Sequence, residues 1–380
     1  MIDNTLNNND EGNKVEEEDT SSERIITQPF SPSDINLTTP PMNMGDLIEM
    51  LDAEWINMKT EYQRSPNLWT ETQQCRLIES ILLGLRLPAF YFEEINKRQW
   101  NIIDGLQRCC AIYNFCITKK LVLNDLEFLG KSFNGKTFND LNFETRREIK
   151  MLPITVNLLK CGVPDLVKYI LFKRLNTGGV NLKPQEIRNA VFSGKAIDTI
   201  REMANYETFK IATQNIIKTK RQEHLDFVSR FVAFYVNHWE DYEPDLEHFI
   251  NLSMEYLKDK ATDEFIRKLK SDFDHTMYIC SEIFGNRAFR KQENRDEPRR
   301  PINKAYFEVV SSSFAKLSPK GRERLLTNKE LLIDNMNTAM RIDSSYNRSF
   351  SDGTGSISAV GKRHSMMKLI IKATLNNRSI

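Results

Sequence analysis

The residues of this sequence best suited to chemistry lie in the stretch Ile102–Arg108. An apolar run leads there into a turn that carries Asp104, Gly105, Gln107 and Arg108. A glycine lets the backbone approach a ligand closely, and an arginine fork matches the oxygens of a phosphate or carboxylate. Asp104 and Gln107 could hold a metal ion or a water molecule. These residue types suit the phosphate chemistry of nucleotides or nucleic acids, although Asp-Gly also occurs in ordinary turns between a strand and a helix.

Three further polar segments accompany this turn in a fixed order: Tyr62-Gln63-Arg64 with Trp69, then Phe172–Gly179, then Pro184–Ala190. Together with the turn, this ordered set resembles the N-terminal domain of the GmrSD-type modification-dependent restriction endonucleases. That family is related to the ParB/sulfiredoxin fold. The resemblance covers roughly residues 45–195. Separated motifs in the right order are far more specific than any one of them.

The resemblance implies a domain that binds a nucleoside triphosphate, hydrolyses it, and couples this reaction to DNA sensing in anti-phage defence. It implies that Arg108 and Arg64 neutralise phosphates and that Gly105 permits close backbone approach. Asp104 would hold a divalent ion such as Mg²⁺, directly or through water. Gln107 would orient the attacking water or the γ-phosphate. The other candidate phosphate ligands of this pocket are Gln63, Arg174, Asn176 and Thr177.

The segment after residue 172 has two interpretations. In the first, Asn176 and Thr177 line the same pocket as Arg108. In the second, the segment is a helix–turn–helix that serves only to position Arg174 and Arg188. The residue before Pro184 is Lys183, where the family usually has Ser or Thr, and a lysine cannot accept a backbone N–H in a helix cap. The sequence leaves both interpretations open.

The turn itself departs from the family pattern, because Leu106 stands where the first of two glutamines is common. If that amide orients the attacking water, hydrolysis is weakened in this chain; if Gln107 does so, hydrolysis is untouched. Restriction enzymes of this type cut with an HNH domain, and His248, which we expect on the surface of a helix, lacks the framing of such a site. We therefore expect nucleoside triphosphate, DNA and a separately encoded nuclease as partners. Two rival functions are a metal-dependent ParB-like DNA nuclease and a catalytically silent module that recruits a nuclease.

The hydrophobic pattern places the turn between a strand and a helix. Strands are expected at 90–92, 100–103 and 154–159, with a hairpin turn at 96–98 and a helix that starts after Gly105. Beyond residue 195 the apolar spacing is almost wholly helical. The predicted fold class is α+β: a ParB/sulfiredoxin-like small mixed-sheet domain followed by an all-helical domain. The expected boundaries are 1–44 (disordered), 45–195 (nucleotide-binding), 196–345 (helical) and 346–380 (loop and C-terminal helix).

Composition limits the remaining choices. The 380 residues have a formal net charge of +1, so any phosphate site must be local rather than part of a general basic field. The six cysteines lack the spacing of a zinc site, so we expect them to be reduced thiols. The sequence has no run long enough to cross a membrane and no secretory signal, so we expect a cytoplasmic protein. The basic loop at 287–300 is expected to be solvated, and the Gly/Ser-rich tail from 350 either connects flexibly or closes over the pocket.

Overall fold

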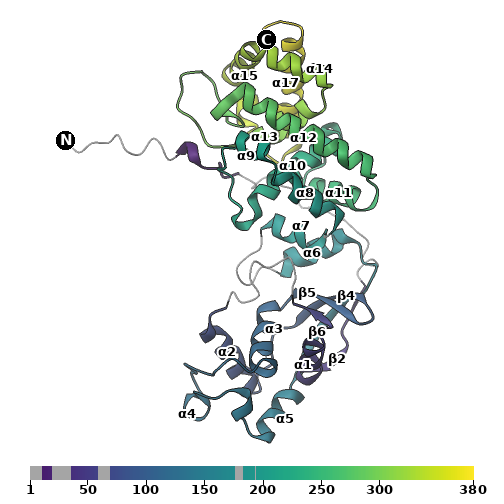
Figure 1. Cartoon of the computed structure of the whole chain (residues 1–380), viewed down its shortest axis with the longest axis vertical. Coiled ribbons are helices and arrows are strands. Elements are labelled where there is room, and N and C mark those ends of the chain that lie inside the picture. The colour runs from purple at the N-terminus through teal and green to yellow at the C-terminus, as the bar shows by residue number, and fades with distance from the viewer. Residues whose placement is uncertain (1–10, 19–35, 59–68, 176–182, 193) are drawn as a thin grey trace, which may run out of the picture. The chain divides into compact units, whose positions relative to one another are not determined.

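A computed structural model describes residues 11–18, 36–58, 69–175, 183–192 and 194–380. The chain divides into two compact units. The α+β unit comprises Gln28–Leu182 and Asn189–Val191, and the helical unit comprises Met1–Thr27, Lys183–Arg188 and Phe192–Ile380. The mixed α+β character predicted from the sequence is confirmed, with the sheet in the first part of the chain and helices in the remainder (Figure 1).

The sheet of the α+β unit is mixed. Its strands are ordered β1-β6-β4-β5-β3, and β2 also pairs with β6. Strands β4 and β5 form the predicted antiparallel hairpin, whereas β4 pairs with β6 and β3 with β5 in parallel. The strand bounds are β1 Leu37–Thr38, β2 Pro41–Asn43, β3 Ile56–Asn57, β4 Phe90–Asn96, β5 Gln99–Asp104 and β6 Pro153–Leu159.

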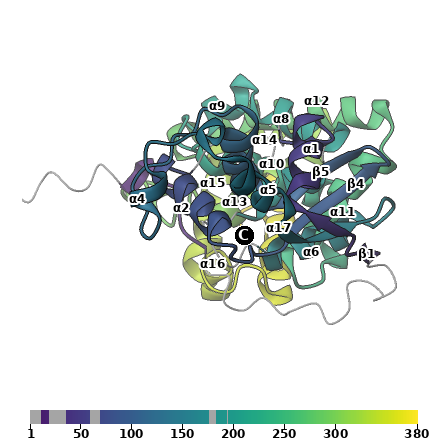
Figure 2. The ribbon, with the colours of Figure 1, turned by 90° about the horizontal axis from the view of Figure 1, so that it is seen from below.

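One face of this sheet is covered by helices whose apolar sides form the core. Phe90 and Phe92 of β4 alternate with partly exposed neighbours, as expected for a strand with one buried face. They belong to one hydrophobic cluster with residues of α1, α2, α3 and α5. Figure 2 shows the ribbons of α1, α2 and α5 from below. The helix bounds are α1 Met44–Asp52, α2 Glu71–Leu82, α3 Leu106–Ile112, α4 Gly130–Phe133 and α5 Phe143–Met151.

Helix starts in this unit follow from capping residues. Asn43 accepts the Asp46 backbone N–H at 2.9 Å, and the Asp46 carboxylate accepts the Asn43 N–H at 2.8 Å. Thr70 and Gln73 cap α2 in the same reciprocal way. Such a capping box satisfies two of the backbone donors that the first turn of a helix leaves unpaired. These capping residues therefore determine where α1 and α2 begin.

Helix α6 (Asp165–Leu175) contacts β5, and its Lys168 fixes it to the neighbouring strand β4. The Nζ atom of Lys168 lies 2.6 Å from Glu93 and 3.0 Å from Asp165. Glu93 is the neighbour of the core residue Phe92 and so points to the opposite face of the sheet. Helix α6 therefore covers the face that the core helices leave open.

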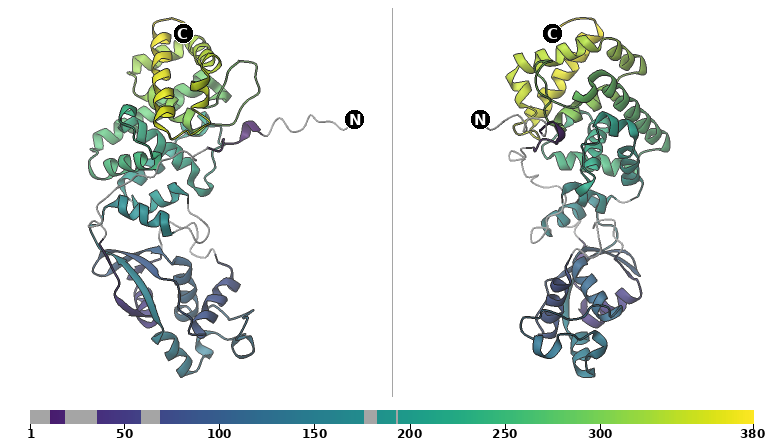
Figure 3. Two further views of the ribbon diagram at one scale, coloured as in Figure 1. Left: turned by 180° about the vertical axis from the view of Figure 1, so that it is seen from behind. Right: turned by 60° about the vertical axis from the view of Figure 1, so that its left-hand side comes forward.

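The helical unit is built from packed amphipathic helices, as the sequence predicts. Phe231 of α10 and Phe273 of α12 have ring centroids 4.7 Å apart, and Phe307 of α13 lies 5.1 Å from Phe227. Helices α15 and α17 lie side by side (Figure 3). The bounds are α7 Pro184–Val191, α8 Lys195–Ala204, α9 Glu207–Ala212, α10 Glu223–Val236, α11 Leu246–Asp259, α12 Asp263–Phe284, α13 Lys304–Ala315, α14 Pro319–Thr327, α15 Lys329–Ile342, α16 Ser344–Arg348 and α17 Ile357–Leu375.

Two features differ from the sequence expectations. Within the segment expected to be disordered, residues 37–38 and 41–43 pair with β6, and residues 11–18 pack in the helical unit. These pairings are long-range, and local composition does not reveal them. Among the described helices, none is both long and apolar enough to cross a bilayer.

Candidate functional site

The candidate site is the turn that joins β5 to α3. Asp104 ends the strand, and Gly105 adopts φ +106° at the cap of the helix that starts at Leu106. A side chain at Gly105 would be strained by this φ, and its Cβ would lie 2.7 Å from Cδ1 of Phe90. Glycine is therefore required twice, by the backbone angle and by the close approach of the Phe90 ring.

Arg108, predicted to neutralise phosphates, is held by the protein itself. Its Nη1 donates to the Pro88 carbonyl, and its Nη2 donates to the Ala89 carbonyl at 3.2 Å and to Asp104 Oδ2 at 2.8 Å. The guanidinium lies over the Phe90 ring, 4.5 Å from its centroid, and the side chain is 11% exposed. Arg108 thus ties the start of β4 to the turn and fixes one oxygen of the Asp104 carboxylate.

Asp104 is the more exposed residue of the ion pair that it forms with Arg108. Its side chain is 42% exposed, against 11% for Arg108, so solvent or a ligand can reach the carboxylate. Within the described residues, no group of three or more His, Cys, Asp or Glu side chains could hold a metal ion. A divalent ion at Asp104 would therefore need water or ligand oxygens to complete its coordination.

Gln107 is fixed by a chain of hydrogen bonds that leads to α2. Its Oε1 accepts the Trp69 backbone N–H at 3.1 Å, and the Trp69 carbonyl accepts from Gln74 Nε2 at 3.2 Å. Gln74 Oε1 in turn accepts from Asn114 at 2.9 Å. Sequence reasoning singled out Trp69 and Gln107 but missed Gln74 and Asn114. The only signal in the sequence was a polar residue on the apolar side of a helix. Gln74 is such a residue, and it is only 5% exposed.

Leu106 and the two cysteines that follow Arg108 are core residues. Leu106 is almost fully buried and belongs to the hydrophobic cluster beneath the sheet. Burial raises the pKa of Cys110 to about 11 and raises that of Cys109 as well, which leaves both thiols protonated and poorly nucleophilic.

The other predicted ligands are not all visible at this turn. Gln63, Arg64, Asn176 and Thr177 lie outside the described residues. Arg174 is exposed on the last turn of α6, the helix that packs on β5. The structure thus brings together Asp104, Gly105, Gln107 and Arg108, and it places Arg174 on the helix packed against the same strand.

Arg188, the other arginine of the helix–turn–helix interpretation, belongs to the helical unit. It is 1% exposed and donates to Asp226 at 2.9 Å and to Gln185 at 2.8 Å. Lys183 does not cap α7 through its side chain; its backbone N–H donates to Glu186 at 2.8 Å. Arg188 is thus engaged within the helical unit, and both interpretations of the segment stay predictions, because Asn176 and Thr177 lie outside the described residues.

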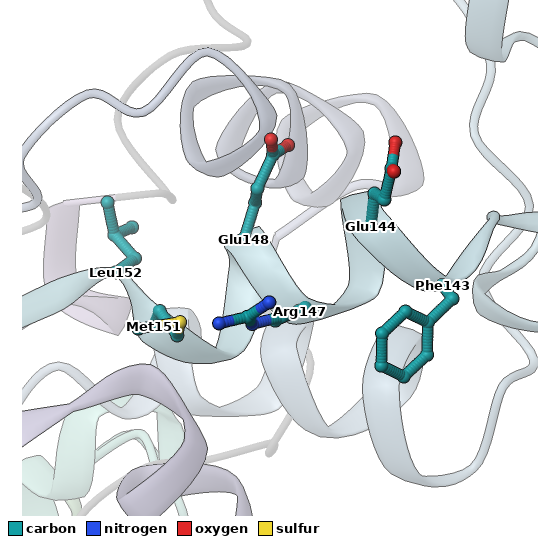
Figure 4. Close-up of a pocket in the computed structure, with 6 residues that line it drawn as sticks. All are labelled: Phe143, Glu144, Arg147, Glu148, Met151 and Leu152. Atoms are coloured by element: carbon teal, nitrogen blue, oxygen red, sulfur yellow. The ribbon is translucent and has the colours of Figure 1, made fainter.

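A separate hollow lies beside α5 in the α+β unit. Phe143 and Met151 line it and are 73% and 62% exposed, and Glu144 and Glu148 project from the same side of the helix (Figure 4). Its lining includes none of the predicted site residues. The turn, with its fixed buried arginine beside a partly exposed carboxylate, remains the better candidate for phosphate chemistry.

His248 is half-buried on α11 rather than on the surface of that helix. Burial lowers its pKa, and its Nδ1 is buried without a hydrogen-bond partner among the described residues. The ring therefore packs as a neutral side chain of the helical unit, which gives no support to a nuclease role for it.

The sequence model of the family described as GmrSD restriction endonuclease, N-terminal domain, matches residues 47–193. This range contains the whole turn, its partners on α2 and β4, and helix α6. Residues 47–193 are thus similar to a GmrSD N-terminal domain. No curated protein and no solved structure matches the chain. The similarity of this range suggests a component of a restriction or defence system.

Proposed function

We propose that the GmrSD-like domain of this chain binds a nucleoside triphosphate at the Asp104–Arg108 turn and hydrolyses it while the protein senses DNA. The observation that carries this proposal is the half-exposed Asp104 carboxylate, fixed on one side by a buried arginine beside the tethered Gln107 amide. The mixed sheet, with its turn leading into a helix, supports a ParB/sulfiredoxin-like fold for this domain.

In this proposal Asp104 would hold Mg²⁺, which would neutralise charge on the phosphates of the bound nucleotide. Arg108 acts as a positioning residue, because its contacts with two carbonyls and with Asp104 fix the carboxylate toward the ligand. Gln107 orients the attacking water. The oxygen of this water forms a bond to the γ-phosphorus while the bond between the γ-phosphorus and the nucleoside diphosphate oxygen breaks. One proton of the water passes to solvent or to phosphate. The remaining phosphate contacts are assigned to Gln63, Arg64, Arg174, Asn176 and Thr177.

The position of Leu106 supports Gln107 as the amide that acts on water. Leu106 packs among core residues, so a side chain at this position does not reach the open side of the turn. Gln107, one residue later on the helix, is only half-buried and is tethered to the Trp69 backbone. The substitution that separates this chain from the common family pattern therefore falls on a core position.

A thermal-shift screen of the four nucleoside triphosphates, with and without Mg²⁺, tests binding, because a ligand that binds only the folded state raises the melting temperature. We expect a Mg²⁺-dependent rise for wild type and for the exposed control Asp52→Asn, and a lost rise for Asp104→Asn. Phosphate release should fall in Gln107→Ala. No rise with any nucleotide would overturn the proposal.

The same experiments separate the rival functions. Binding without phosphate release in wild type would identify a silent module that recruits a separately encoded nuclease. Plasmid nicking that needs a divalent ion and disappears in Asp104→Asn would identify a nuclease. Duplex affinity depends largely on phosphate neutralisation, and the net charge of +1 gives no general support for tight DNA binding by the chain alone.

A further inference from the structure

The acidic segment at residues 11–18 lies against the helical unit, where a 3-10 turn at Glu11–Asn13 leads into a strand-like stretch around Val15. Val15 forms a parallel bridge with Ile302: Glu16 donates its N–H to the Ile302 carbonyl at 2.8 Å, and Ile302 donates to the Lys14 carbonyl at 3.0 Å. In Figure 3 this segment is the purple stretch, and the elements of the helical unit are green and yellow. An extended backbone that pairs in this way is a common mode of peptide recognition.

Glu18 is bound by a buried arginine. Arg230 of α10 donates through Nη1 to Glu18 Oε1 at 2.8 Å and through Nη2 to Oε2, so the contact is bidentate. The Arg230 side chain is 7% exposed, and the Thr354 hydroxyl adds a contact to Glu18 at 3.5 Å. A guanidinium fork binds phosphate in the same geometry as carboxylate.

Glu16 is bound two residues earlier by the same surface of the helical unit. We call the basic surface that residues 12–18 cover the groove; its cations are Arg230, Lys291, Arg290 and Arg299. The Glu16 carboxylate accepts from Lys291 Nζ at 2.7 Å and from Asn303 Nδ2 at 3.1 Å. Lys291 also donates to the Ser351 hydroxyl at 2.6 Å, so the Gly/Ser-rich stretch at 351–356 forms part of the wall. Glu17, between the two bound carboxylates, is exposed, as the alternation of an extended strand requires.

The groove continues with positive charge toward residue 12. Arg290 donates to the Gly12 carbonyl at 2.8 Å, and Arg299 donates to the Asn13 side chain. Burial, together with the neighbouring guanidinium groups of Arg299 and Arg287, lowers the pKa of Arg290 to about 10. The basic loop expected to be solvated is therefore partly buried under this segment.

The carboxylates beneath the groove already have partners of their own. Asp226 pairs with Arg188 at 2.9 Å and Lys304 at 3.1 Å, and Glu308 pairs with Arg363 at 2.8 Å. Arg230 lies 3.7 Å from Asp226 and 3.8 Å from Glu308, farther than from Glu18. Glu18 thus supplies the direct anionic contact of Arg230, and it comes from a segment remote in sequence.

We propose that this groove, lined by Arg230, Lys291, Arg290 and Arg299, binds the phosphates of a nucleic-acid strand, and that residues 12–18 occupy it as an internal substitute. A single small anion would need one of these cations. Their contacts with residues 12, 13, 16 and 18 are spread along the segment, which suits a linear polyanion. Asn303 and Thr354 add neutral donors of the kind that contact phosphate oxygens. The proposal is independent of nucleotide binding at Asp104.

Binding of a fluorescein-labelled oligonucleotide, single-stranded and duplex, by the full chain tests this proposal through fluorescence anisotropy. The variant Glu16→Gln/Glu18→Gln removes the bound carboxylates, and Glu17→Gln with Lys14→Gln provides a control at exposed positions of the same segment. We expect about tenfold tighter binding for the first variant, in line with the free energy of a buried charge contact, and little change for the control. Adding Lys291→Gln to the first variant should abolish the gain.

Equal affinities for the wild type and Glu16→Gln/Glu18→Gln would overturn the proposal, and so would full displacement of the oligonucleotide by polyglutamate at equal charge concentration. Hydrogen exchange of wild type provides a second measurement that needs no variant. The Glu16 amide is bonded to Ile302, so it should exchange faster when the oligonucleotide displaces the segment. Unchanged exchange at saturating oligonucleotide would contradict displacement. Asp104→Asn should change neither result, which separates this proposal from the proposed function.

Discussion

Two buried arginines, Arg108 in the α+β unit and Arg230 in the helical unit, are stabilised in opposite ways. Arg108 donates to two neutral carbonyls and a single carboxylate that is itself half-exposed. Burial alone would lower the pKa of Arg230, but the carboxylates of Glu18, Asp226 and Glu308 raise it. At Arg108 the carboxylate of Asp104 stays partly accessible beside the turn. At Arg230 the acidic segment of the chain itself covers the guanidinium through Glu18. An arginine near a candidate site is thus informative only once its partners are known.

The largest effect is expected where the buried charges are most tightly coupled, at Arg363. This side chain is 0% exposed and binds Glu308, which is also fully buried; burial alone would raise the pKa of Glu308, and Arg363, His364 and Arg230 hold it below its usual value. Arg363→Met should lower the free energy of unfolding of the helical unit by about 3–5 kcal/mol, because it leaves a buried charge unpaired. Urea denaturation measures this, with exposed Arg341→Met as the control. A loss no larger than in the control would contradict the charge coupling.

A smaller loss is expected at Arg108, where the partners are mostly neutral. Arg108→Met should cost about 2–3 kcal/mol, since the Pro88 and Ala89 carbonyls lose their donors and Asp104 loses its fixed position. The matched control is Arg86→Met, at an exposed position before the same strand. If Arg108→Met destabilised the α+β unit no more than Arg86→Met does, the positioning role of Arg108 would be wrong.

Gly105 tests the turn itself. Gly105→Ala should cost about 1–3 kcal/mol, because alanine at φ +106° is strained and its Cβ would meet the Phe90 ring. Gly162→Ala is the comparison: it has φ +91° but no atom within 4 Å of the added Cβ. Thermal unfolding of both variants separates strain from crowding, and equal losses would show that the approach of Phe90 has no energetic consequence.

The smallest effect is one of pH, and it should separate the two units. All five histidines follow residue 223, so the range 28–182 has none. Burial lowers the pKa of His224, His248 and His364 below that of the unfolded chain, near 6.5. The unfolded state therefore binds protons first, and stability present above about pH 6.5 is lost as pH falls.

Hydrogen exchange at pH 7.5 and 5.5, corrected for intrinsic rates, measures this difference. Peptides from α10, α11 and α17 should lose protection at the lower pH, and peptides from the sheet should keep theirs. Equal loss of protection in the two units would show that the buried histidines do not control the acid response.

The sequence predicted much of the α+β unit because its decisive contacts are local. Asp104 and Arg108 are four residues apart, the β4–β5 hairpin closes over a short turn, and the capping residues sit beside the helices they start. The packing of Leu106 into the core was not predicted, because a single leucine at the first helical position carries no sign of which way it points.

The groove of the helical unit could not be predicted, because its contacts join distant parts of the chain. Glu18 and Arg230 are 212 residues apart, and Lys291 meets both Glu16 and Ser351. Composition alone made residues 1–44 look disordered and the loop at 287–300 look solvated. Both expectations treat each segment in isolation, whereas here the acidic segment and the basic loop neutralise each other.

The most direct test of the central claim is calorimetric titration of the full chain with each nucleoside triphosphate in the presence of Mg²⁺, for wild type and Asp104→Asn. The account predicts that at least one nucleotide binds wild type at a single site. It also predicts that Asp104→Asn, with its fold unchanged, weakens this binding by about tenfold or more, as expected for loss of a charged metal ligand. Equal affinity in the two proteins, or no binding to wild type, would contradict the account.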